Sequence, residues 1–129
     1  MGDLTALLRG IYDARDPDEA IAALLRLSDP EIELWPAGLW LDDSNVVRGH
    51  EELEGFFRRL EEAFGEFHFE PERFEERGTA VAVAVRLEVR GRFSGIAGDR
   101  TVGHLWTFRD GHALRIQAFE LPEDAFAAL

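Results

Sequence analysis

The sequence predicts an α+β fold in which N-terminal helices pack on one side of a curved, mostly antiparallel sheet. Apolar residues recur at helical spacing in residues 4–27 and again in residues 50–64. From residue 66 onward, apolar and polar residues alternate instead, and turn-forming residues separate the alternating runs. The chain has 129 residues, of which 46% are hydrophobic, so it can build a core of its own. We therefore expect a single domain over residues 1–129.

Two helices are expected at the N-terminus. The first spans residues 4–15, with Asp3 as its N-cap. Pro17 breaks this run and suits the first turn of the second helix, which Asp29-Pro30 ends. Residues 31–35 then alternate as a short strand. The two faces of this strand carry, in turn, Ile32 with Leu34, and Glu33 with Trp35.

A loop and a third helix follow. Pro, Gly, Asp, Ser and Asn interrupt residues 36–48, yet Trp40 and its neighbours are too apolar to be left in water. We expect this loop to act as a lid over the interior or to contact a partner chain. The third helix spans residues 50–64 and carries one apolar stripe. The stripe consists of Leu53, Phe56, Phe57, Leu60 and Phe64.

The strand expected over residues 79–92 has two different faces. One face is aliphatic and consists of Val81, Val83, Val85, Leu87 and Val89. The other mixes alanine with charge and consists of Ala80, Ala82, Ala84, Arg86, Glu88 and Arg90. The sequence leaves open which of the two faces lines the interior.

Asp110-Gly111 predicts a two-residue hairpin turn, because a type I′ turn needs positive φ at both central residues. A two-residue loop would pair Phe108 with Ala113 and continue in register along both strands. One face of the hairpin would then carry His104, Trp106, Phe108, Arg115, Gln117 and Phe119. The other would carry Leu105, Thr107, Leu114, Ile116 and Ala118. Apolar walls with a few polar groups are typical of a ligand cavity, so we expect the aromatic face to line a pocket.

Composition excludes several partners. The chain has 14 basic and 26 acidic residues and a net charge of −12, which argues against nucleic acid and against anionic membrane surfaces. It has no cysteine, and its four histidines lack metal-ligand spacing, so no metal site is expected. No glycine-rich segment precedes a helix as a dinucleotide loop would, so we expect no cofactor. No apolar run approaches the roughly 20 residues of a membrane span. No signal peptide is apparent, and a cytoplasmic protein is the simplest interpretation.

Several motifs together resemble the SnoaL-like and ketosteroid-isomerase-like branch of the NTF2-like superfamily. They are Asp16-Pro17-Asp18-Glu19-Ala20-Ile21, Val47-Arg48-Gly49-His50-Glu51-Glu52-Leu53, Trp106-Thr107-Phe108-Arg109-Asp110-Gly111 and Pro122-Glu123-Asp124-Ala125-Phe126. The resemblance implies a cone-shaped α+β fold with a deep apolar pocket between the helices and the concave face of the sheet. It also implies homodimers, often formed by packing of sheet surfaces, which would cover the aliphatic face of the hairpin.

Residue by residue, the resemblance transfers only part of the isomerase chemistry. Those enzymes place a general-base Asp where this chain has Trp35, and an indole cannot abstract a proton. Their protonated oxyanion-donor Asp corresponds to His104, which can still donate a hydrogen bond. Their catalytic Tyr lies on the first helix, but Tyr12 falls two or three residues away, so its role is not carried over.

His104 is the candidate catalytic residue, as a general acid or base or as an oxyanion donor, since an imidazole pKa of about 6.5 lies near neutral pH. The alternative is a buried neutral histidine bonded to Gln117. Arg115 and Gln117 would orient a substrate, although Arg115 could instead pair with Glu88. The candidate substrate-binding residues are Tyr12, Trp35, Trp40, Phe56, Phe57, Leu60, Trp106, Arg115, Gln117 and Phe119.

Two functions stay open, beside a purely structural dimer whose cavity is filled by its own aromatic side chains. One is a cyclase- or isomerase-type enzyme that acts on a hydrophobic substrate. The other is a non-catalytic, dimeric binding module for a hydrophobic small molecule. A second ionisable group near His104 separates them: Arg86 or Glu88 in the pocket would favour the enzyme, whereas a pocket lined by the valine face would favour the binding module.

Overall fold

The computed structural model describes residues 3–36, 46–90 and 100–129. Ten elements follow one another along the chain. They are α1 (Asp3–Asp13), α2 (Pro17–Leu27), β1 (Ser28–Trp35), β2 (Val47–Arg48), α3 (Gly49–Phe64), β3 (Glu66–Arg77), β4 (Ala80–Arg90), β5 (Arg100–Arg109), β6 (His112–Phe119) and α4 (Pro122–Ala127). This order of helices and strands confirms the predicted α+β class.

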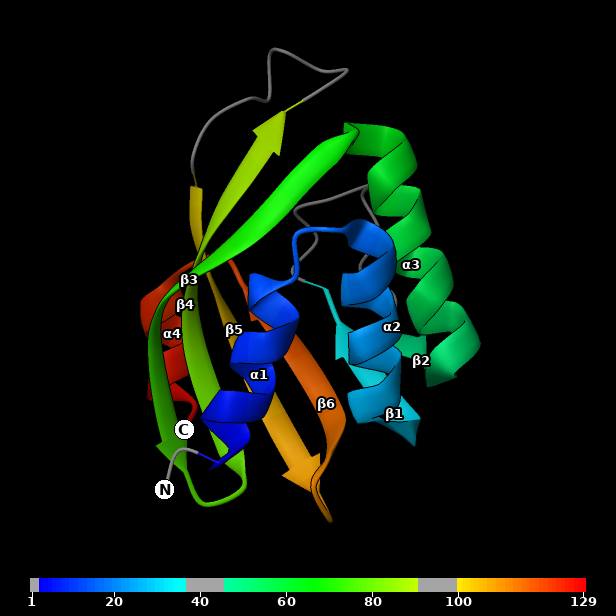
Figure 1. Ribbon diagram of the computed structural model, residues 1–129. Helices are drawn as coiled ribbons and strands as arrows, with labels where there is room; N and C mark the ends of the chain where they lie inside the picture. Colours follow the sequence, from blue (N-terminus) through cyan, green and yellow to red (C-terminus); the bar gives the residue numbers. More distant parts are fainter. Residues whose placement is uncertain (1–2, 37–45, 91–99) are drawn as a thin grey trace.

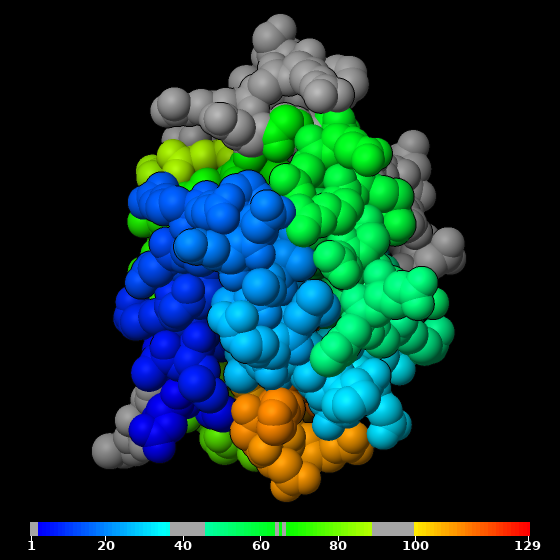
Figure 2. Space-filling view, turned by 45° about the vertical axis from the view of Figure 1, so that its right-hand side comes forward, coloured from blue at the N-terminus to red at the C-terminus, as the bar shows by residue number. Residues whose placement is uncertain are grey.

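The strands form one six-stranded sheet in the order β2-β1-β6-β5-β4-β3. Only β1 and β6 run parallel, and all other neighbours are antiparallel. The sheet bends strongly, and α1, α2 and α3 lie across its concave face (Figure 1). Figure 2 shows the three helices side by side over that face, with the turn of the β5–β6 hairpin emerging below them.

Local sequence explains where the helices stop. Ser28 is the C-cap of α2, since its backbone is already extended, with φ −80° and ψ 136°. Its backbone N–H bonds to the carbonyls of Leu24 and Leu25, and its Oγ donates to the same Leu24 carbonyl at 2.7 Å. The second helix therefore ends at Leu27, and β1 begins at Ser28, three residues before the predicted strand. Gly65 ends α3 with a φ of 72°, which side-chain-bearing residues rarely adopt.

The short helix α4 packs on the convex, outer face of β4 and β5, opposite the other three helices. Gly103 permits this close approach, because a Cβ there would lie 2.8 Å from Ala125 Cβ and 3.0 Å from Pro122 Cα. Part of the outer face is therefore covered by the chain itself. Among the described helices, none is long and apolar enough to cross a membrane.

The hairpin turn is confirmed, but the predicted register beyond it is wrong. Asp110 and Gly111 both have positive φ, 54° and 80°, and Phe108 pairs with Ala113 as expected. A β-bulge then shifts the register, so that Thr107 pairs with Arg115 and Trp106 pairs with Ile116. The extra residue, Leu114, moves the residues from Arg115 to Ala118 to the face opposite the predicted one, whereas Phe119 at the end of β6 still lines the interior.

Candidate functional site

The valine face of β4 lines the interior of the cone. The β4 valines pair with the β5 residues that face the helices: Val81 with Trp106, Val83 with His104 and Val85 with Val102. Directly paired residues share a face, and the three valines are fully buried. Arg86 and Glu88 alternate with the valines and thus belong to the outer face. This settles the choice that the sequence left open and favours an apolar pocket.

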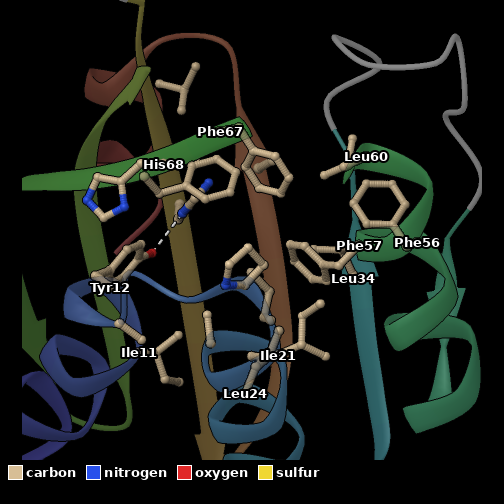
Figure 3. Close-up of a pocket in the computed structure, with 18 of the residues that line it drawn as sticks. Ile11, Tyr12, Ile21, Leu24, Leu34, Phe56, Phe57, Leu60, Phe67 and His68 are labelled. Atoms are coloured by element: carbon tan, nitrogen blue, oxygen red, sulfur yellow. Dashed lines mark hydrogen bonds between the residues drawn. The ribbon is translucent and has the colours of Figure 1, made fainter. Parts of the chain in front are cut away.

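A cavity of about 140 Å³ lies between the helices and the concave face of the sheet. Figure 3 shows how its walls are arranged: Ile11 and Tyr12 come from α1, Ile21 and Leu24 from α2, and Phe56, Phe57 and Leu60 from α3. The sheet contributes Leu34, Phe67, His68, Phe69, Val102, His104, Trp106, Ile116, Ala118 and Phe119. The walls are therefore almost entirely aliphatic and aromatic.

Three polar side chains form a hydrogen-bonded chain on one wall. The Trp106 indole N–H donates to the Tyr12 hydroxyl at 2.9 Å. The same hydroxyl lies 2.7 Å from His104 Nδ1, the contact marked by the dashed line in Figure 3. Tyr12 and Trp106 are buried, with exposed fractions of 5% and 3%. These two hydrogen bonds thus join helix α1 to strand β5 in the middle of the core.

The donors and acceptors of this chain fix the form of His104. The Tyr12 hydroxyl proton needs an acceptor in a buried site, and His104 Nδ1 is the described acceptor within reach. His104 Nδ1 is therefore unprotonated, and the ring proton of the neutral imidazole lies on Nε2. Among the described residues, Nε2 has no hydrogen-bond partner and is not fully buried. A ligand in the cavity can therefore accept a hydrogen bond from it.

Burial sets the electrostatics of the site. It lowers the pKa of His104 to about 4, since the imidazolium form would lose its hydration there. Burial also raises the pKa of Tyr12, and the hydrogen bond from Trp106 only partly opposes this. At neutral pH both groups are uncharged. The arrangement can donate a hydrogen bond to a carbonyl or a developing oxyanion, but it is poorly suited to take up a proton.

Trp35, Arg115 and Gln117 lie outside this cavity. Strand alternation and the β-bulge place them on the outer face, where Trp35 pairs with Gln117 across the parallel β1–β6 ladder. The Arg115 guanidinium lies over the Trp35 ring, 4.7 Å from its centre. Their predicted substrate-binding role therefore loses its geometric basis.

A carboxylate anchors this outer cluster. The Trp35 indole N–H donates to Glu33 at 3.0 Å and lowers the pKa of that carboxyl below its usual value. Arg48 and Arg115 also approach Glu33, at 3.4 and 3.9 Å. The tight turn that predicted the hairpin does not reveal the bulge, so the sequence assigned these side chains to the wrong face.

The other residues predicted for the site either line the cavity or lie outside the described part of the chain. Tyr12, Phe56, Phe57, Leu60, His104, Trp106 and Phe119 all line the cavity. Trp40 and most of the predicted lid lie outside the described residues. The alternative hydrogen bond from His104 to Gln117 is not formed, because the register shift pairs His104 with Ala118.

Sequence reasoning missed that Tyr12 is the partner of His104. The two residues are 92 positions apart, and only the packing of α1 on the sheet brings them together. A single buried tyrosine on the apolar stripe of a helix was the available signal, because a buried hydroxyl needs a polar partner. Ile116 and Ala118 were missed as wall residues because of the bulge.

Metal binding finds no support in the described part of the chain. None of its His, Asp and Glu side chains form a group of three or more that could hold an ion. His50 bonds to the Ser28 carbonyl at 2.9 Å, and His68 bonds to Glu70 at 2.8 Å. Both rings therefore have hydrogen-bond partners other than His104.

Comparison with known proteins identifies relatives by family and by fold. Residues 5–116 match the family described as SnoaL-like domain. No sequence among the curated proteins matches the chain significantly. Many solved structures share the fold, and three of them are compared next.

An NTF2-like protein of unknown function from Burkholderia pseudomallei K96243 is 20% identical, with a TM-score of 0.79 over 98% of this chain and 97% of that one. TerC, co-crystallised with polyporic acid, is 26% identical, with a TM-score of 0.76 over 98% of this chain and 96% of that one. A proposed SnoaL-like polyketide cyclase from Jannaschia sp. CCS1 is 20% identical, with a TM-score of 0.74 over 90% of this chain and 83% of that one.

Proposed function

The chain belongs to the SnoaL-like domain family, and from that premise we propose that it binds a hydrophobic small molecule in the cavity and donates a hydrogen bond to it from His104 Nε2. The observation that carries the proposal is the 2.7 Å contact between Tyr12 and His104. It leaves His104 Nε2 as a donor in a pocket whose other charged or imidazole side chains, Arg15, Glu61 and His68, have partners of their own. A few oriented polar groups in an apolar pocket are the usual composition of a small-molecule site.

Binding without chemistry fits the lining best. The valine face of β4 keeps Arg86 and Glu88 out of the pocket. Among the described residues that line the cavity, the acidic one is Glu61. Its carboxylate accepts a hydrogen bond from Arg58 at 2.9 Å. A reaction at a carbonyl compound would need a base in addition to the His104 donor, and an ion-paired carboxylate is a weak one.

A second candidate is a cyclase- or isomerase-type enzyme. A neutral imidazole N–H in a water-poor cavity is a preorganised donor for a developing enolate oxygen. Fold neighbours that are proposed polyketide cyclases give this chemistry its precedent. In that case His104 acts as the oxyanion donor, since its Nδ1 is occupied by Tyr12.

Ligand titration by calorimetry tests the binding proposal in the wild type and in variants, and NMR of the His104 ring in the wild type reports whether the ligand contacts that ring. Polyporic acid, the compound co-crystallised with TerC, and simple aryl ketones serve as probes. Wild-type protein should bind at least one of them, and His104→Phe should weaken that binding about tenfold, the value of one hydrogen bond. Arg115→Ala, on the outer face, is the matched control and should leave the affinity within about twofold.

The enzyme candidate is tested with the same ketones in D₂O. Catalysed exchange of the hydrogens next to the carbonyl, lost in His104→Phe, would establish enolisation. Binding without exchange would establish the binding module. If His104→Phe binds the probes as tightly as the wild type, the proposed role of His104 is wrong.

A further inference from the structure

The volume of the cavity limits the size of the ligand that it can enclose. Its volume is about 140 Å³. An engineered protein cavity of about 150 Å³ holds a single benzene ring. The enclosed part of a ligand is therefore one ring, or two fused rings if part of the second lies at the opening.

The direction of such a ligand follows from where the polar atoms lie. Tyr12 stands on the α1 side of the cavity, and Phe57 and Leu60 stand on the α3 side (Figure 3). His104 of β5 lies beside Tyr12, since the two side chains are in hydrogen-bond contact. Phe69 meets the His104 ring edge to face, with centroids 5.4 Å apart. An acceptor oxygen on the ligand thus points to His104, and its apolar ring lies against aromatic walls.

The lining also restricts charge. Its described basic side chains are Arg15 and two histidines, His68 and His104. The Arg15 side chain is 74% exposed and lies 3.9 Å from Glu70, so it stands in solvent at the opening. His68 bonds to that same Glu70. No described cation is therefore buried where it could neutralise an anion beside His104.

His104 itself does not supply that charge at neutral pH. Its pKa of about 4 leaves the ring uncharged. The net charge of −12 adds a long-range potential that disfavours anions near the opening. Burying a carboxylate against these walls would remove its hydration without replacing it.

Resting on the proposed function, we infer that the ligand of this cavity is an uncharged aromatic compound of one or two fused rings whose carbonyl or hydroxyl oxygen accepts the hydrogen bond of His104. Ionised carboxylates of equal size and compounds with three or more fused rings are rejected. The size limit follows from the cavity volume, and the charge limit follows from the exposure of Arg15 and the apolar walls.

A series of probes tests both limits by calorimetry at pH 7. Acetophenone and benzoate have equal numbers of non-hydrogen atoms and differ in charge. Three of the probes are uncharged ketones of increasing size: acetophenone has one ring, 1-tetralone has two fused rings and 9-fluorenone has three fused rings. Buried apolar area alone would make affinity rise with every ring, so a break in that rise marks the size limit.

We expect acetophenone to bind at least about tenfold more tightly than benzoate, and 1-tetralone at least about tenfold more tightly than 9-fluorenone. Phe57→Ala, which enlarges the cavity, should admit 9-fluorenone. If this variant folds poorly, Phe57→Leu is used in its place and should admit 9-fluorenone in part. Leu121→Ala changes a side chain that is 51% exposed and should leave all affinities unchanged.

Four outcomes would overturn the inference. Benzoate binding within about threefold of acetophenone removes the charge limit, and 9-fluorenone binding more tightly than 1-tetralone in the wild type removes the size limit. Binding of polyporic acid without binding of any small ketone also overturns it and leaves the proposed function standing. Binding of no probe at all overturns the proposed function, and the inference with it.

Discussion

A single hydroxyl decides the chemistry of the candidate site. Tyr12 accepts a hydrogen bond from Trp106 and donates one to His104, so one oxygen satisfies two buried nitrogen atoms. Through these bonds it orients the imidazole and assigns its proton to Nε2. The tautomer of His104 is thus a consequence of a side chain on another element.

Tyr12→Phe should therefore reduce the free energy of unfolding by about 2 kcal/mol. The substitution leaves the Trp106 indole N–H and His104 Nδ1 buried without partners, and each unsatisfied group costs about 1–3 kcal/mol, offset in part by local rearrangement. Urea unfolding measures the loss. Nitrogen-15 NMR of the His104 ring should show a single tautomer in the wild type and a mixture in the variant. An unchanged tautomer in Tyr12→Phe would contradict the assignment.

The lowered pKa of His104 makes the stability depend on pH. In the unfolded chain the imidazole binds a proton below a pH of about 6.5, whereas in the folded protein it does so only below about 4. Stability conferred by the neutral folded ring is therefore fully present above pH 6.5. It decreases as the pH falls from 6.5 to 4, by roughly 3 kcal/mol in total.

His104→Gln is the control for this pH dependence, because glutamine can accept from Tyr12 and does not titrate. Urea midpoints of both proteins between pH 7 and pH 4 give the difference in stability. Carboxylates such as Glu33 and Glu76 contribute to both proteins and cancel in that difference. A difference that stays constant over the whole range would show that His104 is not held neutral by burial.

At the scale of elements, one inserted residue determines which side chains reach the cavity. The bulge at Leu114 turns Ile116 and Ala118 inward and Arg115 and Gln117 outward. Parallel pairing with β1 shifts at the same place, between Ser28 and Glu33. The bulge therefore fits β6 to two neighbours at once, which is a property of the assembled sheet.

This explains what the sequence could and could not predict. Apolar periodicity located the helices and strands, because each element buries one face. The Asp110-Gly111 turn identified the hairpin, but a turn fixes only the nearest pairs. The bulge, the partner of His104 and the inward face of β4 depend on contacts between residues far apart in the chain, so local patterns did not reveal them.

The packing of α4 gives a prediction at this scale. Gly103→Ala should reduce the free energy of unfolding by about 1–3 kcal/mol, because the new Cβ meets the Pro122 backbone, which cannot rotate away. Gly10→Ala is the matched control. A Cβ at Gly10 meets nothing within 4 Å, and alanine in helix α1 should instead raise stability by about 0.5–1 kcal/mol.

Thermal unfolding of both glycine variants checks this prediction. Ligand affinity should be unchanged in Gly103→Ala, since α4 and the cavity lie on opposite faces of the sheet. A Gly103→Ala protein as stable as the wild type would show that α4 is not held against β5 as closely as described.

At the scale of the whole molecule, the apolar side chains on the outer face of the sheet favour association of two chains, whereas the net charge opposes it. The aliphatic patch expected from the sequence is smaller than predicted, because Ile116 is buried inside and α4 covers part of β4 and β5. Trp35 on β1 and Leu114 on β6 remain half-buried, as does Leu105 on β5. This surface is mixed in character, with Arg115 over the Trp35 ring.

We propose that two chains associate through this surface and that their association depends on salt. Each chain carries a net charge of −12, so two chains repel one another at a distance. The screening length is about 30 Å at 0.01 M salt and about 8 Å at 0.15 M, so added salt removes most of this repulsion.

Sedimentation velocity should show a larger dimer fraction at 0.15 M than at 0.01 M. Trp35→Glu should shift the protein to monomer at both concentrations, whereas Leu7→Glu, on the exposed side of α1, should not. A wild-type protein that is monomeric at every salt concentration would contradict the dimer, and the half-buried side chains of β1 and β6 would then be explained by packing within one chain.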